Sequence, residues 1–228
     1  MTGQYIKSKC MAVAKKTKEI LPEIQRQYVK SRVKSRDFTV ISNNCWAGSL
    51  YRYFDLPYLS PTAGLYFFAD DYLKFITDLH HYIEQDMRFI SADKSKYADE
   101  LQHRNQLHVP IGVLDDVEIV FLHYKTEQEA KEKWVRRAKK INWDNLFIKF
   151  SRMNLCTDEH IERFCQLPYR NKFVLNIYKK TKFDCEYYWI GEKNNDEIIR
   201  DTTPFPGNLS LIDLFEKRAE HYPESGLR

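Results

Sequence analysis

Residues 38–58 constrain the fold of this chain more than any other stretch, because their pattern is typical of a strand, a turn and a helix in succession. The apolar run 38–41 is short and continuous, as in a parallel strand that is buried on both faces. Helical spacing follows over 47–54, and the helix is expected to stop before Pro57, because the residue before proline disfavours helical geometry. Small polar residues and a thiol form the turn: Ser42, Asn43, Asn44 and Cys45. This turn lies at the carboxyl end of a strand, where ligands bind in open α/β sheets.

The rest of the chain alternates short apolar runs with segments of helical spacing, which predicts an α/β fold. Further strands are expected at 65–69, 109–114, 117–122, 146–150, 173–177 and 186–190. Helices are expected at 4–36, with a kink or break at Pro22, and at 72–86, 126–140, 158–166 and 210–221. Residues 91–106 are polar and predict a surface loop or an irregular helix, and residues 204–207 predict a turn.

The stretch around the first turn resembles a second stretch further along the chain. A shift of 111 residues places Asn43 on Asn154, Cys45 on Cys156, Arg52 on Arg163, and residues 56–58 on residues 167–169, with both triplets reading Leu-Pro-Tyr. We therefore expect an internal duplication, with similar strand–turn–helix–strand halves near 38–69 and 146–177. The two turns then face each other across a cleft, which adds Asn154 to the candidate site.

Charge is distributed unevenly along the chain. Residues 1–36 hold ten Lys and Arg against two Glu, a net charge of +8, so the remainder carries −4 of the total +4. The pattern predicts a basic helical leader over 1–36 and an α/β domain over 37–228. An anionic membrane surface or a polyanionic polymer is a partner that suits such a leader. A solvated helix face is the plainer interpretation, and nucleic acid is the least favoured partner.

Cysteine usage indicates a reducing compartment. The five cysteines are odd in number and contain no CxxC pair, so neither a disulfide framework nor a zinc site is indicated. No apolar run is long enough to span a membrane. We expect a cytoplasmic protein, with peripheral membrane association through the leader as an option.

The polar turn suggests an anion site. Side-chain donors and free backbone N–H groups at a helix N-terminus suit a phosphate or a carboxylate. A thiol at that position can have a lowered pKa, which makes Cys45 a candidate nucleophile. The alternative is a helix cap beside a buried cysteine, because Asn and Ser favour turns in any case.

Two pairs of adjacent carboxylates occur in the chain. Asp70 and Asp71 follow an apolar run and form a weak candidate site for Mg²⁺ or Mn²⁺, which would bridge to the diphosphate of a sugar nucleotide. Helix capping is the interpretation that we favour for this pair. Asp115 and Asp116 separate the apolar runs 109–114 and 117–122, and they predict a hairpin turn.

Aromatic residues and a histidine complete the set of candidates. His123 ends an apolar run just ahead of a helix cap, which suits a general base, although a structural histidine fits as well. Tyr124 follows it. Trp46 offers stacking surface for a sugar ring, with core packing as the alternative. No GxGxxG, Walker, GxSxG or HExxH motif is present, so the commonest nucleotide-binding, hydrolase and zincin classes are not favoured.

An ordered series of short motifs resembles a known family. The series runs SNNCWAG, PTAGLYF, VPIGVLDDV, FLHYKTEQEA with Trp134 and Arg137, and INWDNL, over about residues 37–206 with the leader outside it. It resembles an uncharacterised bacterial family that is labelled exopolysaccharide biosynthesis protein. The resemblance implies an α/β fold and a cytoplasmic role in polysaccharide assembly, without a proven reaction. Its candidate site residues are Ser42, Asn43, Asn44, Cys45, Trp46, Pro61, Gly64, His123 and Tyr124.

The leading hypothesis is a transferase that moves a glycosyl or acyl group to a saccharide. The polar turn binds the anionic or carbonyl group of the donor, His123 acts as a base on a sugar hydroxyl, and Asp70 and Asp71 hold a metal if one is needed. The rival hypothesis is a non-catalytic module that binds a saccharide or a protein of the polysaccharide machinery.

Overall fold

A computed structural model describes residues 22–201 and 210–217 of the chain. The described residues divide into two compact units, 22–36 with 210–217 and 37–201. The larger unit is a mixed α/β fold with one parallel and one antiparallel sheet, so the predicted fold class is confirmed. The predicted turn at 204–207 and most of the predicted first helix lie outside the described residues.

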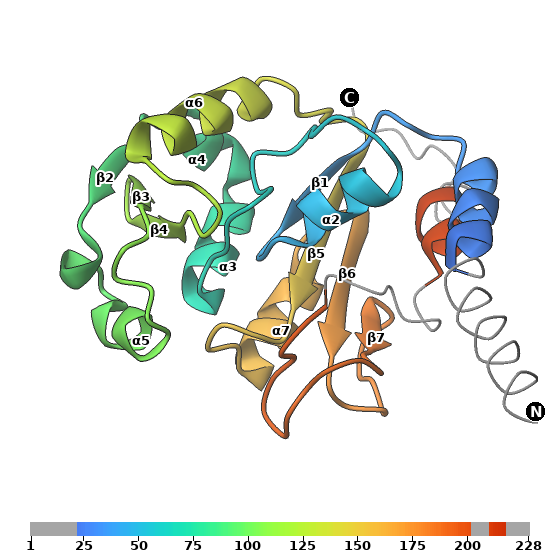
Figure 1. The fold of residues 1–228 in the computed structure, drawn as a ribbon. Coiled ribbons are helices and arrows are strands. Elements are labelled where there is room, and N and C mark those ends of the chain that lie inside the picture. Colours follow the sequence, from blue (N-terminus) through green and yellow to red (C-terminus); the bar gives the residue numbers. More distant parts are fainter. Residues whose placement is uncertain (1–21, 202–209, 218–228) are drawn as a thin grey trace, which may run out of the picture. The chain divides into compact units, whose positions relative to one another are not determined.

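The parallel sheet contains four strands in the order β1-β5-β6-β7 (Figure 1). The strands span Thr39–Ser42 (β1), Leu146–Ser151 (β5), Asn171–Asn176 (β6) and Glu186–Tyr188 (β7). Each matches a predicted apolar run to within a few residues. All residues of β1 are buried, as its continuous apolar pattern predicts.

The backbone of β1 that faces away from β5 is bonded by side chains. The N–H of Val40 donates to the hydroxyl of Tyr51 at 3.1 Å, and the N–H of Ser42 donates to Oγ1 of Thr62 at 3.1 Å. Tyr51 lies on the helix that follows β1, so a local element satisfies the outer side of the strand.

The antiparallel sheet contains three strands, in the order β2-β3-β4. Its strands span Arg88–Ile90 (β2), Ile111–Leu114 (β3) and Val117–Val120 (β4). Asp115 and Asp116 separate β3 from β4, so the predicted hairpin is confirmed, and Asp115 has the positive φ of 54° that such turns use. Strand β2 was not predicted, because its three residues are partly exposed and lack an apolar run.

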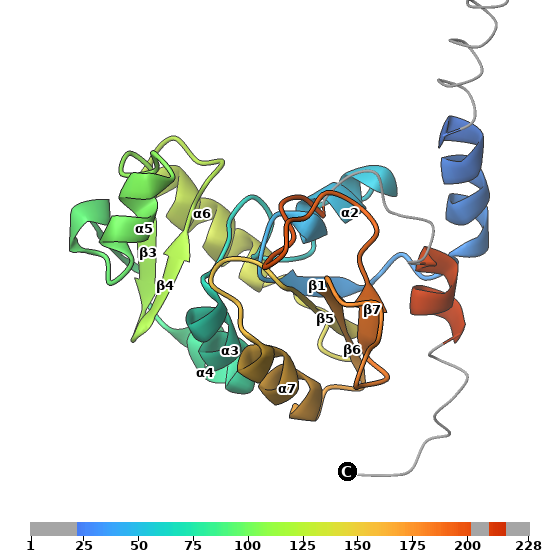
Figure 2. The ribbon, with the colours of Figure 1, turned by 90° about the horizontal axis from the view of Figure 1, so that it is seen from below.

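Helices cover both faces of the parallel sheet. They span Trp46–Tyr53 (α2), Ala69–Thr77 (α3), Leu79–Glu84 (α4), Ala98–His103 (α5), Glu127–Ala138 (α6) and Asp158–Gln166 (α7), with a short 3₁₀ turn at Ala92–Lys94. Figure 2 shows α2 on one side of the sheet and α3, α4 and α7 on the other. Residues 91–106 therefore contain a 3₁₀ turn and the short helix α5, which agrees with the predicted irregular helix.

The prediction of one helix over 72–86 was wrong. The helix begins three residues earlier and is interrupted at Asp78, whose φ of −132° and ψ of 61° are not helical. The side chain of Asp78 accepts a hydrogen bond from the N–H of His81 and so starts α4. An N-cap inside an apolar helical pattern is hard to detect, because the hydrophobic period continues across it.

The predicted cap of α6 is confirmed. Oγ1 of Thr126 accepts from the N–H of Glu129 at 3.1 Å, and the Glu129 carboxylate turns back to accept from the N–H of Lys125. Ala130 and Trp134 of α6 face the core, as the helical spacing predicts.

The internal duplication is not confirmed. Strand β5 and helix α7 lead into β6, which pairs with β5 in the parallel sheet. The first half has no such closing strand, because residues 65–68 contribute only an isolated bridge from Tyr66 to Val120 of the antiparallel sheet. The correspondence therefore ends after the helix in each half.

The smaller unit contains a helical segment over residues 22–32. The N–H of Lys34 donates to Oε1 of Glu216 at 2.7 Å, which joins the end of this segment to residues 210–217. Residues 213–217 form a π-helical turn, so the described part of the predicted last helix is helical.

A buried tyrosine joins α3 to two strands of the parallel sheet. The hydroxyl of Tyr72 lies 3.0 Å from the carbonyl oxygen of Ile41 in β1 and 2.8 Å from that of Lys149 in β5. The ring is fully buried and packs against Phe150 and Phe67.

We expect Tyr72→Phe to lower the free energy of unfolding by about 1–2 kcal/mol, because a buried hydrogen bond is lost and its acceptors stay buried. Urea unfolding measures this change. Tyr178→Phe is the control, because Tyr178 is exposed and should change stability by less than about 0.5 kcal/mol. Equal losses in the two variants would contradict the role given to the Tyr72 hydroxyl.

Candidate functional site

A pocket of about 340 Å³ lies between α2 and α6 in the larger unit. Helix α2 provides one wall, and α6 provides the opposite wall. The loop 58–64 and the turn after β4 close the remaining sides. The lining residues are Cys45, Gly48, Arg52, Tyr58, Ala63, Gly64, His123, Tyr124, Lys133 and Arg137.

Hydrogen bonds between loops fix the floor of the pocket. The N–H of His123 donates to the carbonyl oxygen of Gly64 at 3.1 Å, and the Tyr124 hydroxyl donates to the carbonyl oxygen of Ala63 at 2.6 Å. Gly64 has a φ of +87°, and a Cβ there would lie 3.2 Å from the Tyr124 ring. Glycine is therefore required both by the backbone conformation and by the close ring.

The pocket brings together the two predicted catalytic residues, Cys45 and His123. His123 is exposed, whereas Cys45 is half-buried, and its Sγ donates to the carbonyl oxygen of Leu65. Burial, and next the charge of Asp201, raise the pKa of Cys45 to about 11. The thiol is therefore protonated at neutral pH, which is the opposite of what an activated nucleophile needs.

Arg137 is the most unusual residue of the pocket. Its side chain comes from α6 and is only 6% exposed. Nη1 donates to the carbonyl oxygen of Ala63 at 2.9 Å and to the hydroxyl of Tyr124 at 2.5 Å, and the guanidinium stacks on Tyr58 at 4.7 Å. Nε is buried without a hydrogen-bond partner among the described residues. A buried cation whose donors meet only neutral oxygens has unused capacity for an anion.

The charged side chains that line the pocket are all basic. Besides Arg137 they are Arg52 of α2 and Lys133 of α6, and no carboxylate belongs to the lining. Lys133 is paired with Glu129 at 2.5 Å, and Arg52 donates to Oγ of Ser49 at 3.1 Å. Cations on two walls produce a positive potential inside a partly enclosed volume, which favours an anionic ligand.

Gly64 and Tyr124 were predicted to contact substrate, and both line the pocket. The other predicted substrate contacts lie in the protein interior, where Ser42, Asn43, Asn44, Trp46 and Asn154 are at most 7% exposed. Pro61 is buried as well. Cys45 is thus the member of the polar turn that faces the pocket.

Two of these buried residues hold the backbone together. The amide of Asn43 bonds both the carbonyl oxygen and the N–H of Ser151, which locks the turn after β1 to the end of β5. Nδ2 of Asn154 donates to the carbonyl oxygen of Phe67 at 3.1 Å, and its Oδ1 accepts from Arg104. Trp46 packs edge-on against Phe173 in the core rather than offering a platform for a sugar.

The anion beside the polar turn is a carboxylate of the chain itself. Asp201 accepts hydrogen bonds from Nδ2 of Asn44 at 2.9 Å, from Oγ of Ser151 at 2.5 Å and from Nζ of Lys149. Lys149 and Asp201 are 0% and 1% exposed. The sequence thus predicted an anion site at this turn, and in the structure the carboxylate of Asp201 occupies that place. We call this site the buried polar corner.

Asp70 and Asp71 contact different partners. Asp70 lies 2.9 Å from Nε2 of His160, and Asp71 bonds Nζ of Lys96 at 2.5 Å and the N–H of Glu118 at 2.9 Å. Both lie inside the first turn of α3, whose N-cap is Phe68 and carries no side-chain cap hydrogen bond, so the predicted capping by Asp70 or Asp71 was wrong. No group of three or more His, Cys, Asp or Glu suited to a metal occurs within 22–201 and 210–217, so the metal site stays a prediction.

Sequence reasoning did not select Arg52, Lys133 or Arg137 as site residues. One signal for Arg137 was available, because it lies three residues after Trp134 and seven after Ala130, on the face of α6 that is otherwise apolar. Lys149 carried the same signal inside the run 146–150. Charged residues on core-facing positions are rare and need a partner or a function.

Comparison with known proteins identifies the family. Residues 16–217 match a family described as a domain of unknown function, DUF1919. The chain belongs to this family. The match starts at residue 16, within the segment 1–36 that lies outside the motif series. An uncharacterized protein of Haemophilus influenzae is similar to this member, with 32% identity over 197 residues that cover 84% of this chain and 88% of that protein.

A search for membrane-spanning helices gave none among the residues that the structure describes.

We expect loss of either partner of the buried ion pair to be strongly destabilising. Lys149→Met and Asp201→Asn should each lower the free energy of unfolding by about 3–5 kcal/mol, because each leaves an uncompensated buried group. The double variant should lose less than the sum of the two losses. Lys74→Met serves as the control, because the Lys74–Asp116 pair is exposed and is worth about 1 kcal/mol or less. If the two single variants lose no more free energy of unfolding than this control, the role given to the buried ion pair is wrong.

The raised pKa of Cys45 predicts slow alkylation. At pH 7 the native thiol should react with iodoacetamide ~100-fold or more slowly than a free cysteine, because few molecules carry the thiolate. The rate should increase about tenfold per pH unit up to the pKa. Peptide mass spectrometry measures it at Cys45, and the urea-unfolded chain is the control. Fast alkylation of the native protein at pH 7 would restore Cys45 as a nucleophile.

Proposed function

We propose that this protein is a transferase of cell-surface or exopolysaccharide biosynthesis whose pocket binds a saccharide that carries a phosphate. The polysaccharide context rests on the resemblance of the sequence motifs to the family labelled exopolysaccharide biosynthesis protein, and the chemistry of the pocket supports the anionic ligand. The substrate class is a sugar nucleotide or a sugar phosphate, and the transferred group is glycosyl or acyl.

The single observation that carries the proposal is Arg137. A guanidinium that is nine-tenths buried loses most of its hydration, and neutral oxygens replace it only in part. A phosphate in the pocket would supply the negative charge that the Arg137 guanidinium lacks, because guanidinium groups favour phosphate as a partner. Arg52 and Lys133 would add charge on either side of that phosphate.

The size of the pocket limits how much ligand enters. A volume of about 340 Å³ is at the lower end of the range of ligand sites, which runs from ~300 to ~1,000 Å³. It suits a sugar with one phosphate. The nucleoside of a sugar nucleotide would extend past the rim.

His123 is the proposed base. It lies on the pocket wall and is exposed, so it can take a proton from an acceptor hydroxyl and return it to solvent. The thiol of Cys45 is protonated, so it would serve as an uncharged part of the pocket wall or as a hydrogen-bond donor to the ligand. If the reaction is metal-dependent, Mg²⁺ or Mn²⁺ would enter with the diphosphate, and Asp70 or Asp71 would have to leave its present partner.

A binding module of the same machinery is the second proposal. The same pocket would then hold a phosphorylated saccharide without transfer, which fits a protonated Cys45. Turnover of a bound donor separates the two proposals.

The proposal sets the protein in the cytoplasm, where sugar nucleotides are made. The basic leader would hold it beside an anionic membrane or a partner of the assembly machinery. No role in nucleic-acid binding is proposed.

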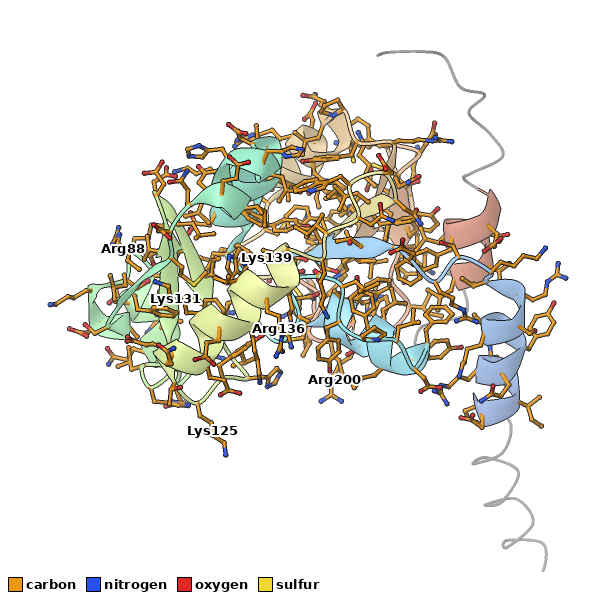
Figure 3. All side chains as sticks on the ribbon, turned by 90° about the horizontal axis from the view of Figure 1, so that it is seen from above. Arg88, Lys125, Lys131, Arg136, Lys139 and Arg200 are labelled. Atoms are coloured by element: carbon orange, nitrogen blue, oxygen red, sulfur yellow. The ribbon has the colours of Figure 1, made fainter. Side chains whose placement is uncertain are left out.

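A matched pair of neighbouring arginines tests the site. Arg136 projects from the exposed face of α6 (Figure 3), so Arg136→Gln changes the charge as much as Arg137→Gln does without touching the pocket. The full chain is heated with sugar nucleotides, sugar 1-phosphates, uronic acids and neutral sugars, with and without Mg²⁺ or Mn²⁺. A ligand that binds the native state raises the melting temperature.

We expect phosphorylated sugars to raise the melting temperature and neutral sugars to leave it unchanged. Arg137→Gln should weaken binding by roughly 10- to 100-fold, since one charged hydrogen bond is worth about 1.5–3 kcal/mol, and Arg136→Gln should have no effect. Arg52→Ala is the second test, because its exposed site keeps the fold intact. No shift with any phosphorylated sugar, or equal losses in the two glutamine variants, would reject the site.

Release of nucleotide or phosphate from a bound donor separates enzyme from binding module. His123→Ala should abolish release and keep the thermal shift if the protein is a transferase. A thermal shift without turnover in the wild-type chain, across acceptors, would favour the binding module.

A further inference from the structure

Two thiols touch on the far side of the larger unit's parallel sheet from α2. Cys165 lies in the last turn of α7, and Cys185 immediately precedes β7. Their Sγ atoms are 2.8 Å apart, and both cysteines are reduced. Neither residue lines the pocket described above, so this pair is independent of the proposed function.

The backbone holds both cysteines in place. The carbonyl oxygen of Cys185 accepts from the N–H of Val174 in β6 at 2.8 Å, and α7 packs against the same strand. Cys185 is 8% exposed, whereas Cys165 is half-buried and so within reach of a small reagent. The contact between the two thiols therefore links α7 to the start of β7, the strand at one end of the parallel sheet.

The distance places the pair close to a bonded geometry. An S–S bond is ~2.05 Å long, so the two sulfurs have to approach by about 0.8 Å, which small side-chain rotations supply. The other described cysteines have different neighbours, because Sγ of Cys45 meets the carbonyl oxygen of Leu65 and Sγ of Cys156 meets that of Thr157.

We propose that Cys165 and Cys185 form a reversible disulfide by exchange with a low-molecular-weight disulfide such as oxidised glutathione. The Cys165 thiolate attacks one sulfur of the reagent, forms a mixed disulfide and releases one thiolate. The Cys185 thiolate then attacks Sγ of Cys165 and releases the second. Two protein thiols are oxidised and one reagent disulfide is reduced, and the two protons lost by the cysteines leave with the two released thiols.

The environment sets the rate of this exchange. The hydrogen bond with Cys185, and next burial, raise the pKa of Cys165 well above its usual range. Little thiolate is present at neutral pH, so exchange is slow there and accelerates as the pH rises. The pair therefore responds to sustained oxidation rather than to a brief pulse.

The bond would tie α7 to the start of β7. The segment after β7 continues to Asp201, whose carboxylate fills the buried polar corner. Trp189 begins this segment with an N–H bond to the carbonyl oxygen of Asn176 at 2.7 Å. Oxidation would thus restrain the strand from which this segment departs and stabilise the native state by closing a loop in the unfolded chain.

The test uses the full chain with oxidised glutathione at pH 8.5. Thiol titration in denaturant should fall from five groups to three. Non-reducing tryptic mass spectrometry should find residues 164–170 joined to residues 183–193. The melting temperature should rise by roughly 5 °C or more, and dithiothreitol should reverse all three changes.

Cys156→Ser is the matched control and should leave the cross-link intact, whereas Cys165→Ser should abolish both the cross-link and the rise in melting temperature. Because the cross-link is read in the wild-type chain, a variant that fails to fold does not decide the outcome. Glutathione adducts without a cross-link, a cross-link through another cysteine, or a full count of five thiols after prolonged incubation would each overturn the proposal.

Discussion

The buried ion pair of Lys149 and Asp201 is the interaction on which the arrangement of the larger unit depends. A lysine in the central part of a sheet is tolerated only when its charge is met, and here Asp201 reaches it from a segment more than fifty positions later. The same carboxylate bonds Asn44 and Ser151, so the first turn, β5 and the late segment are held at one point. Ser42 and Ser151, at the carboxyl ends of β1 and β5, are both fully buried at this corner.

The pocket therefore lies beside α2 rather than at the polar turn's buried side. The polar turn is the common element, since it gives Asn44 to the interior and Cys45 to the pocket. Burial is the main cause that raises the pKa of that thiol, and the charge of Asp201 raises it further whereas that of Lys149 lowers it, so both members of the ion pair act on a pocket residue without lining the pocket. The positive charge of the pocket comes from Arg52 of α2 and from Lys133 and Arg137 of α6, and Nε of Arg137 has no hydrogen-bond partner within the described chain.

Local pattern predicted most of the fold. Continuous apolar runs predicted β1, β5 and β6, and Thr126 with Glu129 predicted the start of α6, because these signals depend on near neighbours in sequence. The cap at Asp78 was not predicted, because it lies within an unbroken apolar period. Strand β2 was not predicted, because its residues are partly exposed. At the site, the strand–turn–helix pattern led to Cys45, but which neighbours would be buried depended on Asp201, a contact over 157 positions that no local pattern reports.

The outer side of β1 carries a consequence for how far the sheet can grow. Strand β1 ends the sheet, and an exposed terminal strand is a template on which a second chain can add and aggregate. The hydroxyls of Tyr51 and Thr62 already occupy the N–H groups of Val40 and Ser42 that such a chain would need. These two side-chain oxygens therefore keep a further strand from pairing with β1, and they disfavour polymerisation by addition of strands at this edge of the sheet.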